Sequence, residues 1–156
     1  MNGSIRVLPE HLAAGLAAVA KVCPKRTTLP ITTSVLLDCA GGRLRLTGTD
    51  LETAIQAWVG ALTDNTPIAL AVEVAGLVAA VKGLGKDSAL TMSVDGRKLT
   101  IEAGVKKYTL VGQDADDFPP VPKPGDDAAT FSIDASAMAQ ALDRTIFSAA
   151  RDNTRP

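Results

Sequence analysis

Hydrophobic and polar residues alternate with the period of a β-strand in several short stretches of the chain. The clearest are residues 4–8, 34–39, 43–48 and 51–62. The glycines at positions 41 and 42 separate the second stretch from the third, as in a hairpin. The pattern predicts one short strand, followed later in the chain by a meander of three antiparallel strands.

A helical pattern follows the first strand. Pro9 and Glu10 are typical of a helix start, and Leu12, Leu16 and Val19 then recur on one stripe. We therefore expect a helix between the first strand and the turn-rich residues 23–30.

The same order of patterns then returns. A strand is predicted at residues 67–72, a helix at 74–84, and strands at 89–94, 98–103 and 107–111. The apolar helix positions Leu12 and Leu16 match Leu77 and Val81 at an offset of 65, and the strand positions Leu44 and Leu46 match Leu99 and Ile101 at an offset of 55. One such unit cannot bury both its helix stripe and its sheet face, so two copies should pack around a pseudo-twofold axis. The predicted fold is α+β: a duplicated β-α-β-β-β unit with two helices against an antiparallel sheet.

The composition changes after this duplication. Residues 113–127 are rich in proline and aspartate, which is typical of an interdomain linker. Beyond them, residues 130–133 are predicted to form a strand and Asp134 to cap a helix whose stripe is Met138, Leu142 and Ile146. We therefore divide the chain into a first domain at 1–118, a linker at 119–128, and the first strand and helix of an incomplete second domain at 129–156.

Charge and aromatic content limit the kinds of nucleic-acid binding. Lys and Arg number 16 against 17 Asp and Glu, so any contact with DNA must come from local placement of charge. Aromatic residues make up only 3%, which argues against a stacking platform for single strands. Trp58 is expected in the core or at its rim.

The sequence offers little support for a metal, a cofactor or catalysis. Cys23 and Cys39 are far apart, and with His11 as the single histidine they do not make a zinc site; buried thiols in a reducing cytoplasm are expected. Asp50 and Glu52 could form a carboxylate pair in a small α+β enzyme, but the turn preference of aspartate is the favoured interpretation. Residues 83–88 depart from a phosphate-binding loop and are expected to form a helix-ending turn.

Several segments resemble bacterial β sliding clamps, the beta subunits of DNA polymerase III. They are KRTTLPI at 25–31, LRLTGTDLE at 44–52, DDFP at 116–119, FS at 147–148 and DNTRP at 152–156. The resemblance covers nearly the whole chain, in the family's order and spacing. It implies a DNA-clamp fold and a longer family chain of three similar domains, of which this sequence is expected to be a fragment or a short paralogue.

The resemblance also implies a function. Two family chains close head to tail into a homodimeric ring around duplex DNA, which acts in DNA replication as a non-catalytic, cytoplasmic processivity factor for DNA polymerase III. The implied partners are duplex DNA, bound without sequence preference, other clamp domains, the clamp loader and DNA polymerase III, with no cofactor and no membrane. Clients dock largely on the second and third domains, so this chain is not expected to recruit polymerase alone. The alternative is a stand-alone clamp-like interaction domain that forms no ring.

Residue roles follow from the same resemblance. Arg26 matches a loop position that touches the DNA backbone, and Lys25 is included as its neighbour. Arg151 and Arg155 match a second stretch of DNA contacts. Tyr108 and Leu110 lie on the last strand of the domain, an edge that in the family pairs with the third domain of the other chain; the alternative is that both side chains simply pack inward.

Overall fold

The computed structural model describes residues 3–40, 42–63, 68–85, 88–122, 125 and 127–149. The chain forms two compact units that divide between Val121 and Pro122. The first unit contains every strand of the described residues, and the second contains the last helix.

The first unit consists of two successive β-α-β-β-β segments, as the repeated pattern predicts. The first segment comprises β1 (Gly3–Val7), α1 (Pro9–Val19), β2 (Ser34–Ala40), β3 (Arg43–Thr49) and β4 (Ala54–Thr63). The second comprises β5 (Ile68–Glu73), α2 (Val74–Leu84), β6 (Leu90–Asp95), β7 (Lys98–Ala103) and β8 (Lys106–Val111). Short 3-10 turns, η1 (Pro30–Thr33) and η2 (Ala115–Asp117), precede β2 and follow β8.

The two segments are joined through their first strands. The eight strands form one antiparallel sheet in the order β5-β2-β3-β4-β1-β6-β7-β8. Thus β1 lies between β4 of its own segment and β6 of the second segment, and β5 pairs with β2 of the first. This arrangement has the pseudo-twofold symmetry expected from the duplication.

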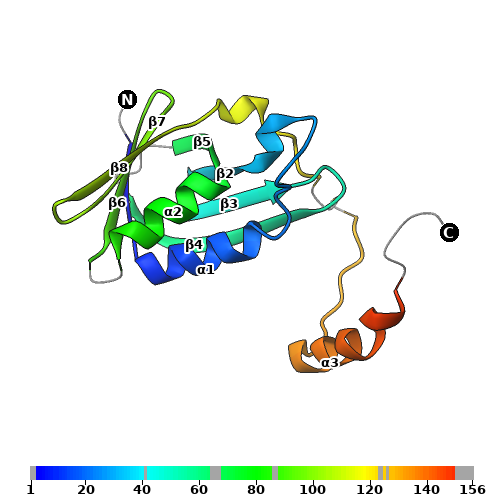
Figure 1. Cartoon of the computed structure of the whole chain (residues 1–156). Coiled ribbons are helices and arrows are strands. Elements are labelled where there is room, and N and C mark those ends of the chain that lie inside the picture. Colours follow the sequence, from blue (N-terminus) through cyan, green and yellow to red (C-terminus); the bar gives the residue numbers. More distant parts are fainter. Residues whose placement is uncertain are drawn as a thin grey trace. The chain divides into compact units, whose positions relative to one another are not determined.

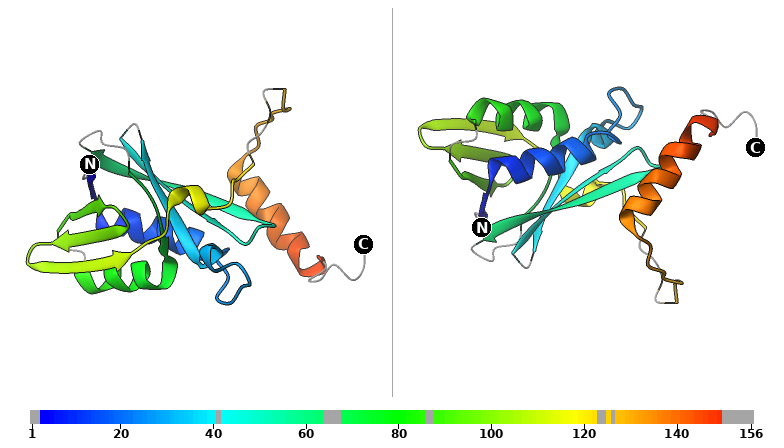
Figure 2. Two further views of the ribbon diagram at one scale, coloured as in Figure 1. Left: turned by 90° about the horizontal axis from the view of Figure 1, so that it is seen from above. Right: turned by 90° about the horizontal axis from the view of Figure 1, so that it is seen from below.

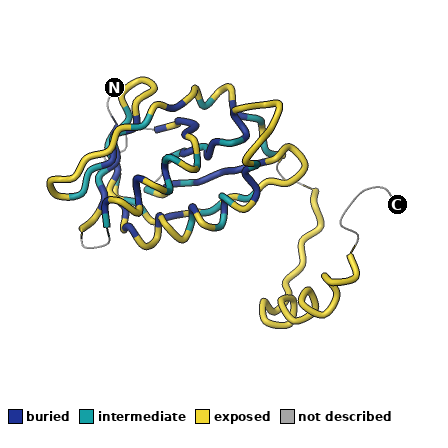
Figure 3. The backbone as a smooth tube through the Cα atoms, in the orientation of Figure 1, coloured by how far each residue is buried: buried dark blue, intermediate teal, exposed yellow. Residues whose placement is uncertain are grey.

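Both helices lie side by side across one face of the sheet (Figures 1 and 2). The apolar residues matched by the repeat are all buried: Leu12, Leu16, Leu44, Leu46, Leu77, Val81, Leu99 and Ile101. Figure 3 shows this burial along the strands and on the sheet side of the helices. Burying these stripes together supplies the hydrophobic stabilisation that neither segment could obtain alone.

The opposite face of the sheet is covered at one end by the segment after β8. Gln113 bridges to Ala71 on β5, and Phe118 is buried in a small cluster with Ile31 and Ala71 that is flanked by Leu36. The residues up to Val121 therefore pack as part of the first unit.

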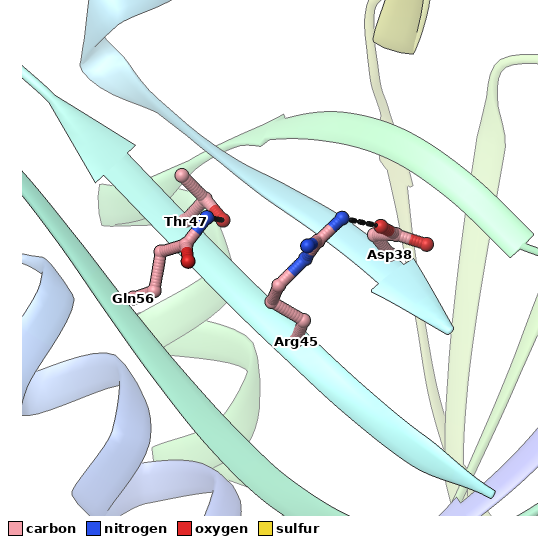
Figure 4. A network of polar contacts seen from close by, with 4 residues as sticks. All are labelled: Asp38, Arg45, Thr47 and Gln56. Carbon is pink, nitrogen blue, oxygen red and sulfur yellow. Dashed lines mark hydrogen bonds and ion pairs between the residues drawn. The ribbon is translucent and has the colours of Figure 1, made fainter. Parts of the chain in front are cut away.

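Trp58 lies on this same face of the sheet, on β4, and not in the core. Its side chain is 58% exposed, and the Arg45 guanidinium lies 5.4 Å from the ring centroid. Arg45 also forms an ion pair with Asp38 (Figure 4). Trp58 was expected in the core or at its rim. The core position is wrong, because Trp58 alternates with the buried Val59 and so points to the other side of the strand.

The second unit contains α3 (Ala135–Thr145) and a 3-10 turn, η3 (Ile146–Ser148). The predicted cap is confirmed, because the Asp134 carboxylate accepts a hydrogen bond from the Ala137 N–H at 2.8 Å. The predicted strand at 130–133 is wrong. These residues have no strand assignment, and within the described residues they have no β partner to supply the ladder bonds that a strand requires.

Candidate nucleic-acid and subunit interfaces

The outward side of α1 and α2 is a nearly uncharged surface of small side chains. Its exposed positions are mostly alanine: Ala13, Ala14, Ala17, Ala75 and Ala79. Glu10 and Lys21 stand at opposite ends of the first helix region, and Glu73 and Lys82 at opposite ends of the second, a distribution that suits the helix dipoles. The exposed alanines themselves therefore provide no positive charge that could attract phosphate.

The loop after α1 supplies two exposed cations, Lys25 and Arg26. Neither side chain forms an ion pair with another described residue. The loop is held at its far end by Thr27 and Thr32. The Leu29 N–H donates to Thr27 Oγ1 at 3.1 Å, and the Thr32 hydroxyl donates to the Leu29 carbonyl at 2.8 Å. The two cations thus stand on an anchored loop.

The near end of the loop is held by Cys23. Its thiol is buried and donates weakly to the carbonyls of Val19 (3.6 Å) and Ser34 (3.7 Å). Burial raises the pKa of the Cys23 thiol above its ordinary value. A cavity of about 400 Å³, which Lys25 and Glu73 both line, lies beside it. The loop therefore begins next to the start of α2.

The other two predicted DNA contacts, Arg151 and Arg155, lie outside the described residues. The structure therefore brings together Lys25 and Arg26, and these remain the DNA-contact predictions that have a described setting.

The predicted subunit edge is β8, the terminal strand at one end of the sheet. Tyr108 is 41% exposed, whereas Leu110 is half-buried and packs against the main core. Both side chains lie toward α2, because a β-carbon on Gly83 would meet the Tyr108 hydroxyl and one on Gly76 would meet Leu110. Both side chains therefore pack toward α2, while the strand that carries them lies at an edge of the sheet.

Sequence reasoning missed the glycines of α2 as part of this edge. Gly83 leaves room for the Tyr108 ring, and its carbonyl accepts a hydrogen bond from Lys106 Nζ at 3.1 Å. The available signal was a pair of glycines in a helix, where glycine is otherwise unfavourable. Gly76 and Gly83 thus lie on the side of α2 that contacts Leu110 and Tyr108 of β8, and we call this contact the α2–β8 seam. Of the helix-ending turn predicted at 83–88, the structure shows that α2 ends at Leu84 and that Gly85 has φ 87°, whereas Lys86 and Asp87 lie outside the described residues.

Asp50, one of the two carboxylates considered for an enzyme, stabilises a turn. Asp50 Oδ1 accepts hydrogen bonds from the backbone N–H groups of Glu52 (3.0 Å) and Thr53 (2.6 Å), which closes the turn between β3 and β4. Within the described ranges, no group of three or more His, Cys, Asp or Glu side chains could hold a metal ion. No helix in that part of the chain is long and apolar enough to cross a membrane.

A duplicated β-α-β-β-β unit, with two helices on one face and an open edge strand, defines a DNA-clamp domain. The sequence model of the family "DNA polymerase III beta subunit, N-terminal domain" matches residues 4–122. The chain belongs to this family.

Similar proteins agree with that membership. The chain is 34% identical over 146 residues to the beta sliding clamp of Pseudomonas putida, and 30% identical over 149 residues to that of Escherichia coli; each match covers 94% of this chain and 40% of the relative. The crystal structure of the Pseudomonas aeruginosa sliding clamp bound to griselimycin has a TM-score of 0.90 at 33% identity, covering 100% of this chain and 42% of that one. The chain thus spans about 40% of the length of these relatives.

Proposed function

We propose that this chain supplies one wall of a sliding clamp, a ring that encloses duplex DNA and tethers the replicative polymerase. The observation that carries the proposal is the pairing of two features on one domain. The helix side presents small side chains flanked by the exposed Lys25 and Arg26, and β8 leaves an open strand edge beside it. The first feature suits a passing duplex, and the second suits a neighbouring domain.

Sliding requires attraction to the phosphate backbone without a fixed register. The exposed alanine side chains of the helices offer no hydrogen-bond donors for base edges, and loop cations reach phosphates independently of sequence. Lys25 and Arg26 are proposed as these phosphate contacts, with Arg151 and Arg155 as further candidates from the sequence.

Ring closure requires pairing at an edge of the sheet. The backbone of β8 on the side away from β7 has no strand partner in the described part of the chain, and the exposed face of Tyr108 lies along it. A second strand added here would continue the sheet, which is a recurrent way for chains to associate. Tyr108 and Leu110 are proposed to contact that strand's domain.

The remaining parts of the proposal follow from the family. The clamp acts as a non-catalytic partner of DNA polymerase III in the cytoplasm, assembled with further clamp domains and placed on DNA by a clamp loader. The stand-alone interaction domain is the competing function, and it differs in forming no ring.

Light scattering distinguishes these two functions. We would measure the mass of this chain alone and mixed with the part of the Pseudomonas aeruginosa clamp that follows its matching region. A ring subunit is expected to form a complex of defined mass. Tyr108→Asp should weaken that complex at least tenfold, since a buried unpaired carboxylate is costly at an interface.

The matched control is Ala69→Asp, which adds the same charge on β5 at the other end of the sheet, where Ala69 is exposed. It should leave the complex intact. An unchanged mass on mixing would support the stand-alone domain, and equal weakening by both variants would contradict the assignment of β8 as the interface.

A further inference from the structure

An open groove lies where the β2–β3 hairpin ends. Arg43, the first residue of β3, pairs with Gly60 of β4, whereas β4 continues to Thr63 alongside β1. Beyond that pair, the Ala61 N–H still donates to the Gly42 carbonyl at 3.4 Å, but within the described residues Leu62 has no strand partner on the side of β3. The resulting groove has a volume of about 640 Å³ and is lined by, among others, Arg6, Leu8, His11, Arg43 and Leu62. We call it the Arg43 groove.

The groove combines an apolar surface with cations. Leu62 is 76% exposed and Leu8 is 46% exposed, although both are large aliphatic side chains. Arg6, which stands opposite Leu62 in the strand register, is exposed, as are Arg43 and His11. Exposed leucines framed by charged groups are typical of a binding surface.

The positive charge of the groove is not neutralised by its own lining. None of the described residues that line it is acidic, and neither Arg6 nor Arg43 forms an ion pair within the described part of the chain. By contrast, Arg45 pairs with Asp38 and Lys107 pairs with Glu102. The whole chain has a net charge of −1. The excess of positive charge in the groove is therefore local and does not reflect an excess of Lys and Arg in the chain.

We propose that the Arg43 groove binds an acidic peptide segment that carries aliphatic side chains. Carboxylates would accept charge-assisted hydrogen bonds from Arg6 and Arg43, and an aliphatic side chain would cover Leu8 and Leu62. This complementarity of charge and apolarity identifies a protein partner. A nucleic acid fits less well, because the described lining has no Phe, Tyr or Trp to stack a base, and the ring that it does contain is the small imidazole of His11.

The site does not depend on ring formation. The groove is formed by β1, β3, β4 and the start of α1, and it does not include the proposed edge β8 or the Lys25 loop. Its test can therefore use the 156-residue chain alone, without DNA and without other clamp domains, so its outcome is distinguishable from that of the ring experiment.

The probe is a fluorescein-labelled peptide of four aspartates followed by two leucines, measured by fluorescence anisotropy. Arg43→Glu is expected to weaken binding at least tenfold, because it replaces an attractive charge by a repulsive one. Leu62→Ser should weaken binding severalfold through loss of the apolar contact. Replacing the two leucines of the peptide by serines should have a similar effect.

The matched control is Arg97→Glu, which makes the same charge change at an exposed arginine in the β6–β7 turn, outside the groove. It should leave the affinity within about twofold, as expected for a distant, screened charge. Circular dichroism of each variant would verify the fold.

Three outcomes would overturn the proposal. Peptide binding could be undetectable at millimolar concentration, or Arg43→Glu and Arg97→Glu could weaken it equally, which would indicate diffuse charge attraction. Alternatively, a single-stranded oligonucleotide could bind more tightly than the peptide with the same dependence on Arg43 and Leu62, which would assign the groove to nucleic acid.

Discussion

Gly48 lies on β3 beneath the last turn of α1. A β-carbon at this position would stand 2.6 Å from Val19 Cγ1, 2.8 Å from Cys23 Sγ and 3.1 Å from the Val19 carbonyl. Because part of this obstruction is backbone, Gly48→Ala must displace the helix. We expect a loss of about 1–3 kcal/mol in the free energy of unfolding, measured by urea denaturation.

Gly60→Ala on β4 is the matched comparison, since a β-carbon there would meet no atom within 4 Å. Reduced freedom of the unfolded chain should make this variant neutral or more stable, by up to about 1 kcal/mol. Similar losses in both variants would contradict close helix–strand packing as the reason for glycine at position 48.

Cys23 couples stability to alkaline pH. Burial raises the pKa of its thiol, whereas the unfolded chain has the ordinary value of 9.0. The folded state therefore favours the neutral thiol, and the stability that this provides is present in full below pH 9 and is lost as the pH rises through the folded pKa. We expect wild-type stability to fall above pH 9 by up to about 1.4 kcal/mol per pH unit from this group.

Cys23→Ala separates this effect from every other ionisation, because wild type and variant share all other groups. The free energies of unfolding of wild type and variant should be measured between pH 7 and pH 10.5. Their difference should be constant up to about pH 9 and should shrink above it. A difference that stays constant throughout would mean that the thiol ionises equally well in the folded chain.

The seam between α2 and β8 is the element that shapes the proposed interface. Replacing either glycine of this seam by alanine gains helix propensity of about 1 kcal/mol. At Gly76 the new methyl group would lie 3.5 Å from Leu110, an ordinary contact, but at Gly83 it would lie 2.5 Å from the Tyr108 hydroxyl. Gly76→Ala should therefore stabilise the fold by about 0.5–1 kcal/mol, whereas Gly83→Ala should yield no gain. Thermal unfolding of the two variants tests this difference.

The strands and helices of the first unit could be predicted from the sequence because each has a clear period. The predicted helix at 74–84 has the same bounds as α2. The strand predicted at 130–133 failed because alternation records which faces of a strand are apolar and does not supply a neighbouring strand. For Trp58, alternation with Val59 places the ring on the side of β4 away from the core, although tryptophan is a highly buried residue on average.

The sequence pattern could not predict that β1 and β5 each pair with a strand of the other segment. The repeat shows that two units exist, and the partner of each strand is decided by long-range pairing, such as Ser34–Cys39 against Ile68–Glu73. The candidate sites show the same limit. Arg26 was predicted from the resemblance of a short segment to the family and Lys25 as its neighbour in sequence, whereas the Arg43 groove joins residues from separate parts of the chain. Because each meander holds the other segment's strand, neither segment could fold alone, and the domain should unfold as one cooperative unit.

For the ring proposed above, the near-neutral helix side predicts a specific dependence of DNA binding on salt. If Lys25 and Arg26 are the phosphate contacts of this domain, they account for most of its attraction to duplex DNA, because the exposed helix positions are mainly alanine. Binding of a reconstituted ring to duplex DNA should then depend on salt through these two cations. The double variant Lys25→Gln/Arg26→Gln should reduce the slope of log K against log salt by about 2 for each copy of the domain, independently of the DNA sequence.

The exposed pair Arg97 and Lys98, in the β6–β7 turn and the first position of β7, offers a control of the same charge and composition. Arg97→Gln/Lys98→Gln lowers the net charge equally, so it reproduces any general electrostatic effect of losing two cations. Fluorescence anisotropy of a labelled duplex at several sodium chloride concentrations compares the two variants. Counterion release depends on cations that neutralise phosphates, so only the Lys25 pair should change the slope. Equal slopes for both variants would mean that the DNA responds to the charge of the whole molecule, and the loop after α1 would then have no special part in holding the duplex.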